Sequence, residues 1–172
     1  MSLDTLTGLP DDARLWCFAT DRSLSSDEAT VVAEGMASFL GGWRAHDQEL
    51  RVGFELRESR FLLVAVDERQ AAASGCSIDA LTGHLRELET RIGVSLIDGA
   101  GVWYRDASGA IRTVSRPDFR RLGDEGSVGP ETLVFDLTLI ALGELRDSRF
   151  EVAARDSWHG RLLTSAGVKS PP

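Results

Sequence analysis

Hydrophobic and polar positions follow three different patterns over the first part of the chain. Residues 14–20 form a short apolar run rich in aromatic side chains, which predicts a strand buried on both faces. Residues 50–57 alternate between apolar and polar, the two-residue period of a strand with one face in solvent. Residues 61–66 are continuously apolar. They therefore predict a central strand that pairs antiparallel with the alternating one.

Two helices are expected between and after these strands. Ser25 and Glu28 have the spacing of a capping box, and the apolar stripe that follows comprises Val32, Met36, Phe39, Leu40 and Trp43. Ser77, with Asp79 in the first turn, is expected to begin the second helix, which Gly93 ends. The stripe of this helix comprises Ile78, Leu81, Leu85, Leu88 and Ile92.

The resulting order, β-α-β-β-α, predicts an α+β fold with a ferredoxin-like half at residues 11–98. A short strand at residues 94–97 would complete that arrangement. Two helices cover only one face of such a sheet, so the other face needs a second cover. Either the C-terminal third of the chain or a second copy in a homodimer is expected to supply it.

Residues 100–160 are expected to form a smaller β-rich half. A hairpin at residues 102–114 precedes a helix that Ser115 caps. Further elements are expected at 133–135 (strand), 139–146 (helix) and 150–154 (strand). The polar ends, residues 1–10 and 166–172, are predicted to be flexible.

Charge and composition exclude several partners and chemistries. Twenty-seven acidic and 19 basic residues leave a net charge of −8, which repels nucleic acid and anionic membranes. No secretory signal or membrane-length apolar run is present, and the free thiols of Cys17 and Cys76 suit a reducing cytoplasm. The single lysine, Lys169, leaves no candidate for a phosphate-binding loop or a Schiff base. The spacing of His46, His84 and His159 predicts no metal site, and no cofactor is expected.

The last third of the chain resembles the second type of GYF domain found in bacterial proteins. The resemblance rests on the aromatic hairpin at 102–109, on Ser115, Phe119, Leu122 and Gly126, and on Pro130-Glu131-Thr132-Leu133-Val134-Phe135. The chain has Thr113-Val114 where the family usually has Gly-Pro. GYF domains bind proline-rich peptides on aromatic surfaces. The resemblance therefore implies a peptide-binding module in which Trp103, Tyr104 and Trp158 contact the ligand.

The whole chain also resembles a group of small uncharacterised bacterial proteins that often carry the label of ABC transporter ATPase. The shared segments are Trp43-Arg44-Ala45-His46, Val66-Asp67-Glu68, residues 73–79, Val134-Phe135-Asp136 and Ser157-Trp158-His159. The missing phosphate-binding loop argues against the ATPase label.

Three functions of different classes remain open. The first is a non-catalytic module that binds a peptide or protein partner. The second is a thiol-dependent enzyme: Cys76 stands at the start of a helix whose dipole favours a thiolate, and His159 or His46 would be its base. The alternative for Cys76 is a small residue at a tight helix entry. The third is a small-molecule sensor with a pocket between the halves.

Overall fold

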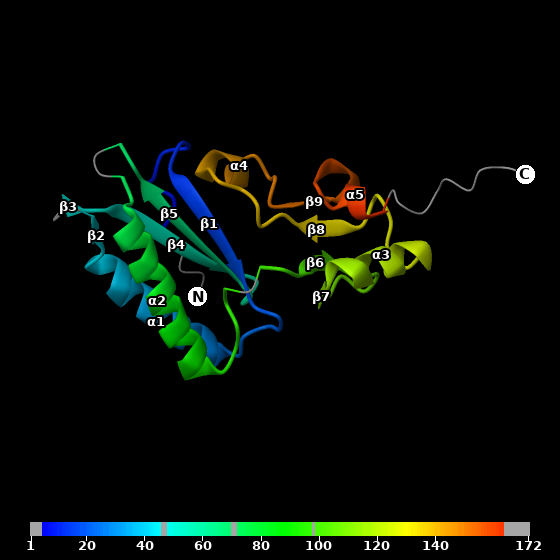
Figure 1. The fold of residues 1–172 in the computed structure, drawn as a ribbon, viewed down its shortest axis with the longest axis horizontal. Helices are drawn as coiled ribbons and strands as arrows, with labels where there is room; N and C mark the ends of the chain where they lie inside the picture. The colour runs from blue at the N-terminus through cyan, green and yellow to red at the C-terminus, as the bar shows by residue number, and fades with distance from the viewer. Residues whose placement is uncertain (1–4, 46–47, 70–71, 98, 164–172) are drawn as a thin grey trace, which may run out of the picture. The chain divides into compact units, whose positions relative to one another are not determined.

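The computed structural model describes residues 5–45, 48–69, 72–97 and 99–163, and it confirms the α+β class (Figure 1). The chain divides into two compact units. The first comprises Met1–Gly99 and Leu137–Asp147, and the second comprises Ala100–Asp136 and Ser148–Pro172. Residues 137–147, which the sequence pattern assigned to the second half, thus belong to the first unit. Within the described part of the chain, no helix has the length and apolarity needed to span a membrane.

The first unit is built on a three-stranded antiparallel sheet. Its order is β1 (Arg14–Ala19), β5 (Phe61–Asp67) and β4 (Arg51–Arg57), with β5 in the centre. Every residue of β5 is buried, as its unbroken apolar run predicts. The prediction that β1 is buried on both faces is wrong, because its middle residues, Trp16 to Phe18, are only partly covered.

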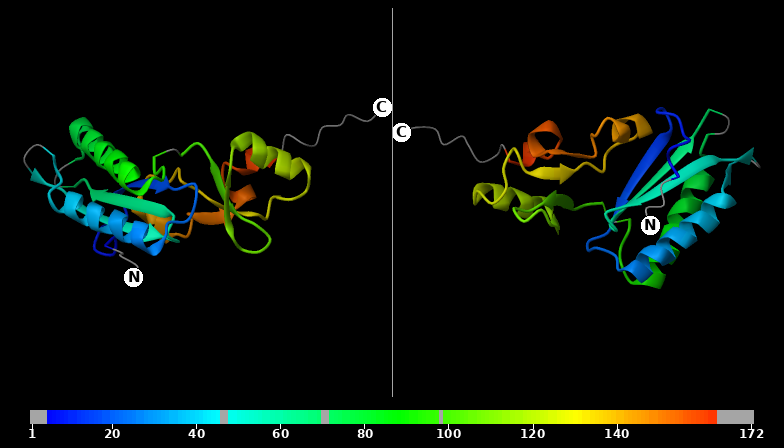
Figure 2. Two further views of the ribbon diagram at one scale, coloured as in Figure 1. Left: turned by 90° about the horizontal axis from the view of Figure 1, so that it is seen from below. Right: turned by 180° about the vertical axis from the view of Figure 1, so that it is seen from behind.

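Two helices pack on one face of this sheet (Figures 1 and 2). Helix α1 (Ser26–Gly41) begins with the predicted capping box of Ser25 and Glu28. Helix α2 (Gly75–Ile92) is capped by Ser74 rather than by Ser77, because the Ser74 hydroxyl accepts a hydrogen bond from the Ser77 amide. Its predicted end at Gly93 is confirmed by a left-handed φ of 66°. A two-stranded ribbon, β2 (Arg44–Ala45) and β3 (Gln48–Glu49), was not predicted.

The strand expected at residues 94–97 does not form. A carboxylate oxygen of Glu89 instead accepts the amides of Leu96 and Ile97 at 2.6 and 2.9 Å. At the free edge of β1, Leu15 donates to Ile140, and Leu142 donates to Ala13, both at 2.9 Å. Residues 140–142 therefore line the edge of β1, and residues 94–97 do not complete the ferredoxin-like arrangement.

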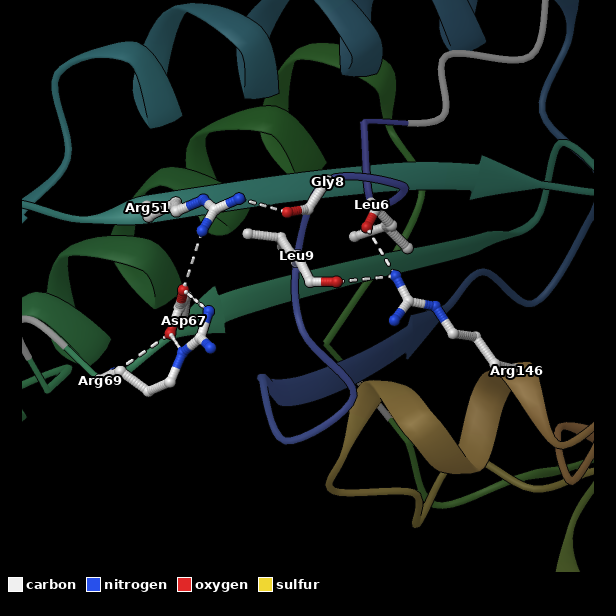
Figure 3. Close-up of polar contacts among 7 residues, drawn as sticks. All are labelled: Leu6, Gly8, Leu9, Arg51, Asp67, Arg69 and Arg146. Atoms are coloured by element: carbon white, nitrogen blue, oxygen red, sulfur yellow. Dashed lines mark hydrogen bonds and ion pairs between the residues drawn. The ribbon is translucent and has the colours of Figure 1, made fainter.

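The N-terminal segment and α4 (Leu142–Arg146) lie over the second face of the sheet (Figure 3). Arg51 of β4 donates to the Gly8 carbonyl from one side of this segment. From the other side, Arg146 of α4 donates to the carbonyls of Leu6 and Leu9 at 3.1 and 2.9 Å. Residues 6–9 thus accept hydrogen bonds from two elements of the first unit, and the flexibility expected of residues 1–10 stays a prediction. Residues 1–4 and the predicted flexible end at 166–172 lie outside the described part of the chain.

The second unit contains a four-stranded antiparallel sheet in the order β7-β6-β8-β9. The predicted hairpin of β6 (Val102–Arg105) and β7 (Ile111–Val114) is confirmed, as is the Ser115 cap of α3 (Arg116–Asp124). Strands β8 (Leu133–Phe135) and β9 (Glu151–Ala153), the 3-10 helix η1 (Ala154–Asp156) and α5 (Gly160–Leu163) complete the unit. Its core contains Val102, Tyr104, Phe119, Val128, Val134 and Ala154.

Candidate functional site

An open groove of about 640 Å³ lies within the second unit. Its walls come from the end of α3, the loop before β8, and the segment from η1 to α5. The lining residues are Gly123, Val128, Gly129, Pro130, Arg155, Asp156, Ser157, Trp158, Gly160, Arg161 and Leu163. A volume of this size suits a small molecule or a few residues of an extended chain.

A tight turn between η1 and α5 presents Ser157 and Trp158 to the groove. The Ser157 amide donates to the Ala154 carbonyl at 3.3 Å, and the Gly160 amide donates to the Ser157 carbonyl at 3.2 Å. A Cβ added at Gly160 would lie 2.9 Å from the Ala154 carbonyl oxygen. Only glycine therefore fits this position without a shift of the backbone.

Two side chains of the same unit lie against the Trp158 ring. The imidazole of His159 stacks on it with the ring centroids 3.8 Å apart. The guanidinium of the exposed residue Arg116 lies 4.8 Å from the ring centroid. Trp158 Nε1 is a buried donor with no hydrogen-bond partner among the described residues. An unpaired buried donor costs free energy, and this N–H lies beneath the surface of the second unit.

Ser157 and His159 form a hydroxyl–imidazole pair. Ser157 Oγ lies 2.8 Å from His159 Nδ1, and the His159 side chain is 1% exposed. Burial lowers the pKa of His159 to about 4; the charge of Asp136 opposes this shift and that of Arg116 reinforces it. The ring is therefore neutral at neutral pH, so Nδ1 can accept a hydrogen bond from the Ser157 hydroxyl.

The charged side chains of the groove are mostly paired. Arg155 forms ion pairs with Glu131 and, at 3.6 Å, with Asp156. The second unit as a whole holds nine basic and eight acidic residues, so its net charge is +1 and the entire net negative charge of the protein lies in the first unit. The groove therefore does not share the acidic character of the whole chain.

The three aromatic residues predicted to contact a peptide differ in position. Trp103 and Tyr104 are only 2% and 8% exposed. Tyr104 lies edge-on to Phe119 in the core of the second unit, with ring centroids 5.5 Å apart. Trp158 lines the groove. Burial thus leaves Trp158 as the member of the set that faces the candidate site.

Cys76 is exposed in the first turn of α2. Of its two predicted bases, His46 lies outside the described residues. His159 belongs to the second unit, where its Nδ1 contacts Ser157. Among the described residues, no cluster of three or more His, Cys, Asp or Glu side chains could hold a metal ion.

Some of the short sequence segments named above contact one another. Trp43 Nε1 donates to the Ser77 carbonyl at 2.9 Å, which joins two of these segments in the first unit. In the second unit, the negative charge of Asp136 raises the pKa of His159, against the larger effect of burial.

Ser157 was not predicted as a site residue, although its spacing of two residues from His159 is visible in the sequence.

Comparison with protein-family models, curated proteins and solved structures found no match to this chain. The function is therefore inferred from the chemistry of the groove and from the resemblances seen in the sequence.

Proposed function

We propose that the protein is an interaction module whose second unit binds an extended, proline-containing peptide in the groove beside Trp158. The observation that carries this proposal is an open groove of about 640 Å³ whose lining includes Trp158 together with the apolar residues Val128, Pro130 and Leu163. The resemblance of residues 102–135 to the bacterial GYF type points to the same class of ligand.

The chemistry of the groove suits an extended chain. A polyproline II segment makes no internal hydrogen bonds and presents its rings and carbonyls along an extended chain. Gly129 has no atom within 4 Å of an added Cβ, which leaves room for a second backbone, and Val128 and Leu163 offer apolar contacts. Flat aromatic and small apolar surfaces of this kind give contact area at low entropic cost.

The side chain of Arg116 would have to move when the peptide binds. It is exposed and covers one face of the Trp158 ring, the surface on which a proline ring would pack. Arg116→Ala should therefore strengthen peptide binding, because the cation–π contact of about 0.5–1 kcal/mol no longer competes.

Titration with proline-rich peptides, followed by tryptophan fluorescence, tests the proposal. Binding should change the emission of the wild-type protein and of Trp16→Phe, a matched change in the first unit. The response should be lost in Trp158→Phe. An unchanged signal across a broad set of peptides, or a response that survives in Trp158→Phe, would count against it.

A further inference from the structure

We propose that the same groove also carries out acyl transfer, with Ser157 as the nucleophile and His159 as its general base, and that its substrate is a small carboxylic ester. The inference rests on the groove of the proposed function. It does not require that the natural ligand be a peptide.

The geometry meets the first requirement of an activated nucleophile. Ser157 lines the groove, and its Oγ lies 2.8 Å from Nδ1 of His159, within the range of a nucleophile–base hydrogen bond. The imidazole is held between Trp158 and the edge of Phe119, whose centroid lies 6.3 Å away. A buried ring held on two sides keeps its nitrogen aimed at the hydroxyl.

The surroundings of the ring set its protonation state. Burial lowers the pKa of His159 to about 4, which keeps the imidazole neutral at neutral pH but also weakens it as a base. The proposed reaction uses the tautomer in which Nδ1 carries the lone pair. Once the ring takes up the serine proton, burial and the charge of Arg116 destabilise the imidazolium, while the negative charge of Asp136 stabilises it.

The reaction balances with water as the co-reactant. Oγ attacks the ester carbonyl carbon, forming a C–O bond, while the hydroxyl proton moves to Nδ1. Collapse of the tetrahedral intermediate breaks the bond to the leaving alkoxide, which takes the proton from Nδ1. Water then attacks the acyl-serine, giving a proton to Nδ1, and that proton returns to Oγ as the acid leaves.

The competing explanation is that Ser157 only stabilises the turn. Its Oγ also lies 3.3 Å from the Ala154 carbonyl oxygen and 3.4 Å from the amide of His159. A capping hydroxyl would not react faster than another exposed serine. Ser108 serves as the internal reference, because it is an exposed hairpin serine whose hydroxyl contacts Asp106 at 2.5 Å.

Incubation of the full-length protein with a fluorophosphonate probe, followed by peptide mass spectrometry, tests the inference. We expect an adduct on Ser157 and none on Ser108, and release of p-nitrophenol from p-nitrophenyl acetate that Ser157→Ala abolishes. His159→Gln should slow both reactions on the order of 100-fold.

Equal labelling of Ser157 and Ser108 in the folded wild-type protein would overturn the inference, even if the His159 variant failed to fold. Undiminished ester cleavage by folded Ser157→Ala would overturn it as well. Peptide binding to the wild-type protein, measured by Trp158 fluorescence, would be unaffected by either failure, so the two proposals fail separately.

Discussion

Gly53 of β4 lies directly against the backbone of Thr5. A Cβ placed on Gly53 would lie 2.5 Å from the Thr5 carbonyl oxygen. The Thr5 amide donates to the Phe54 carbonyl at 3.0 Å, and the Thr5 hydroxyl accepts the Phe54 amide at 2.8 Å. The N-terminal segment thus contacts the sheet at a position where β4 has no side chain.

Gly53→Ala should destabilise the first unit, because the added methyl group meets a backbone atom that cannot move aside. We expect a loss of about 1–3 kcal/mol in the free energy of unfolding. Gly83→Ala is the matched control, since Gly83 lies in α2 with no atom within 4 Å of its added Cβ. That change should stabilise the protein by roughly 0.5–1 kcal/mol. Urea denaturation of both variants checks these two predictions. Equal unfolding midpoints for Gly53→Ala and Gly83→Ala would contradict them.

Asp67 should make the first unit sensitive to strong acid. Hydrogen bonds from Arg69, reinforced by the charge of Arg51, lower the pKa of Asp67 to about 2 (Figure 3). The unfolded value is about 3.9, so this contribution to stability is complete above pH 4 and is lost as the pH falls towards 2. Thermal melts of wild type and Asp67→Asn should differ most above pH 4 and converge near pH 2. A difference that is the same at pH 2 and pH 5 would argue against this role.

His159 should make the second unit lose stability at a milder pH. Its pKa is about 4 in the folded protein and about 6.5 in an unfolded chain. As the pH falls from 6.5 to 4, the unfolded state takes up a proton that the folded state excludes, so stability decreases by a few kcal/mol. Denaturation of wild type and His159→Gln at pH 7, 5.5 and 4 measures this effect. His159→Gln should not show this loss of stability between pH 6.5 and 4. Parallel plots of stability against pH for the wild type and the variant would contradict the prediction.

Cys76 should be alkylated before Cys17. Cys76 is exposed at the start of α2, whereas Cys17 is partly covered in β1. Iodoacetamide at neutral pH, followed by mass spectrometry, should modify Cys76 first. The thiol-enzyme hypothesis makes the stronger prediction that Cys76 reacts faster than a free thiol. A rate at or below that of free cysteine would remove that hypothesis.

Several elements of the fold could be predicted from local sequence because the forces that define them are local. The apolar run of β5 and the capping box of α1 each depend on residues within a few positions of one another. A cover on the second face was expected, and α4 comes from the C-terminal third that was named for it, but the part played by the N-terminal segment could not be predicted in this way. It depends on Arg146, which donates to a carbonyl 140 residues earlier in the chain, and no periodic pattern encodes such a contact.

The failed strand at residues 94–97 has a similar explanation. The amides of Leu96 and Ile97 donate hydrogen bonds to the side chain of Glu89 instead of to a neighbouring strand. Hydrophobic periodicity does not indicate a side chain that replaces a strand partner. The groove was only partly predictable for the same reason. Trp158 was named from its aromatic character, but the burial of His159, and hence the role of Ser157, depends on Phe119 of α3, 40 residues away.

The indole N–H signals of the four tryptophans provide the most direct test of the proposed peptide site. They can be assigned in a ¹H–¹⁵N NMR spectrum from single Trp→Phe variants. On titration with a proline-containing peptide, the Trp158 signal should shift together with the amides of Gly129 and Gly160, while Trp16 and Trp43 stay in place. Shifts confined to Trp16 and Trp43, or no shifts at saturating peptide, would contradict a binding site in this groove.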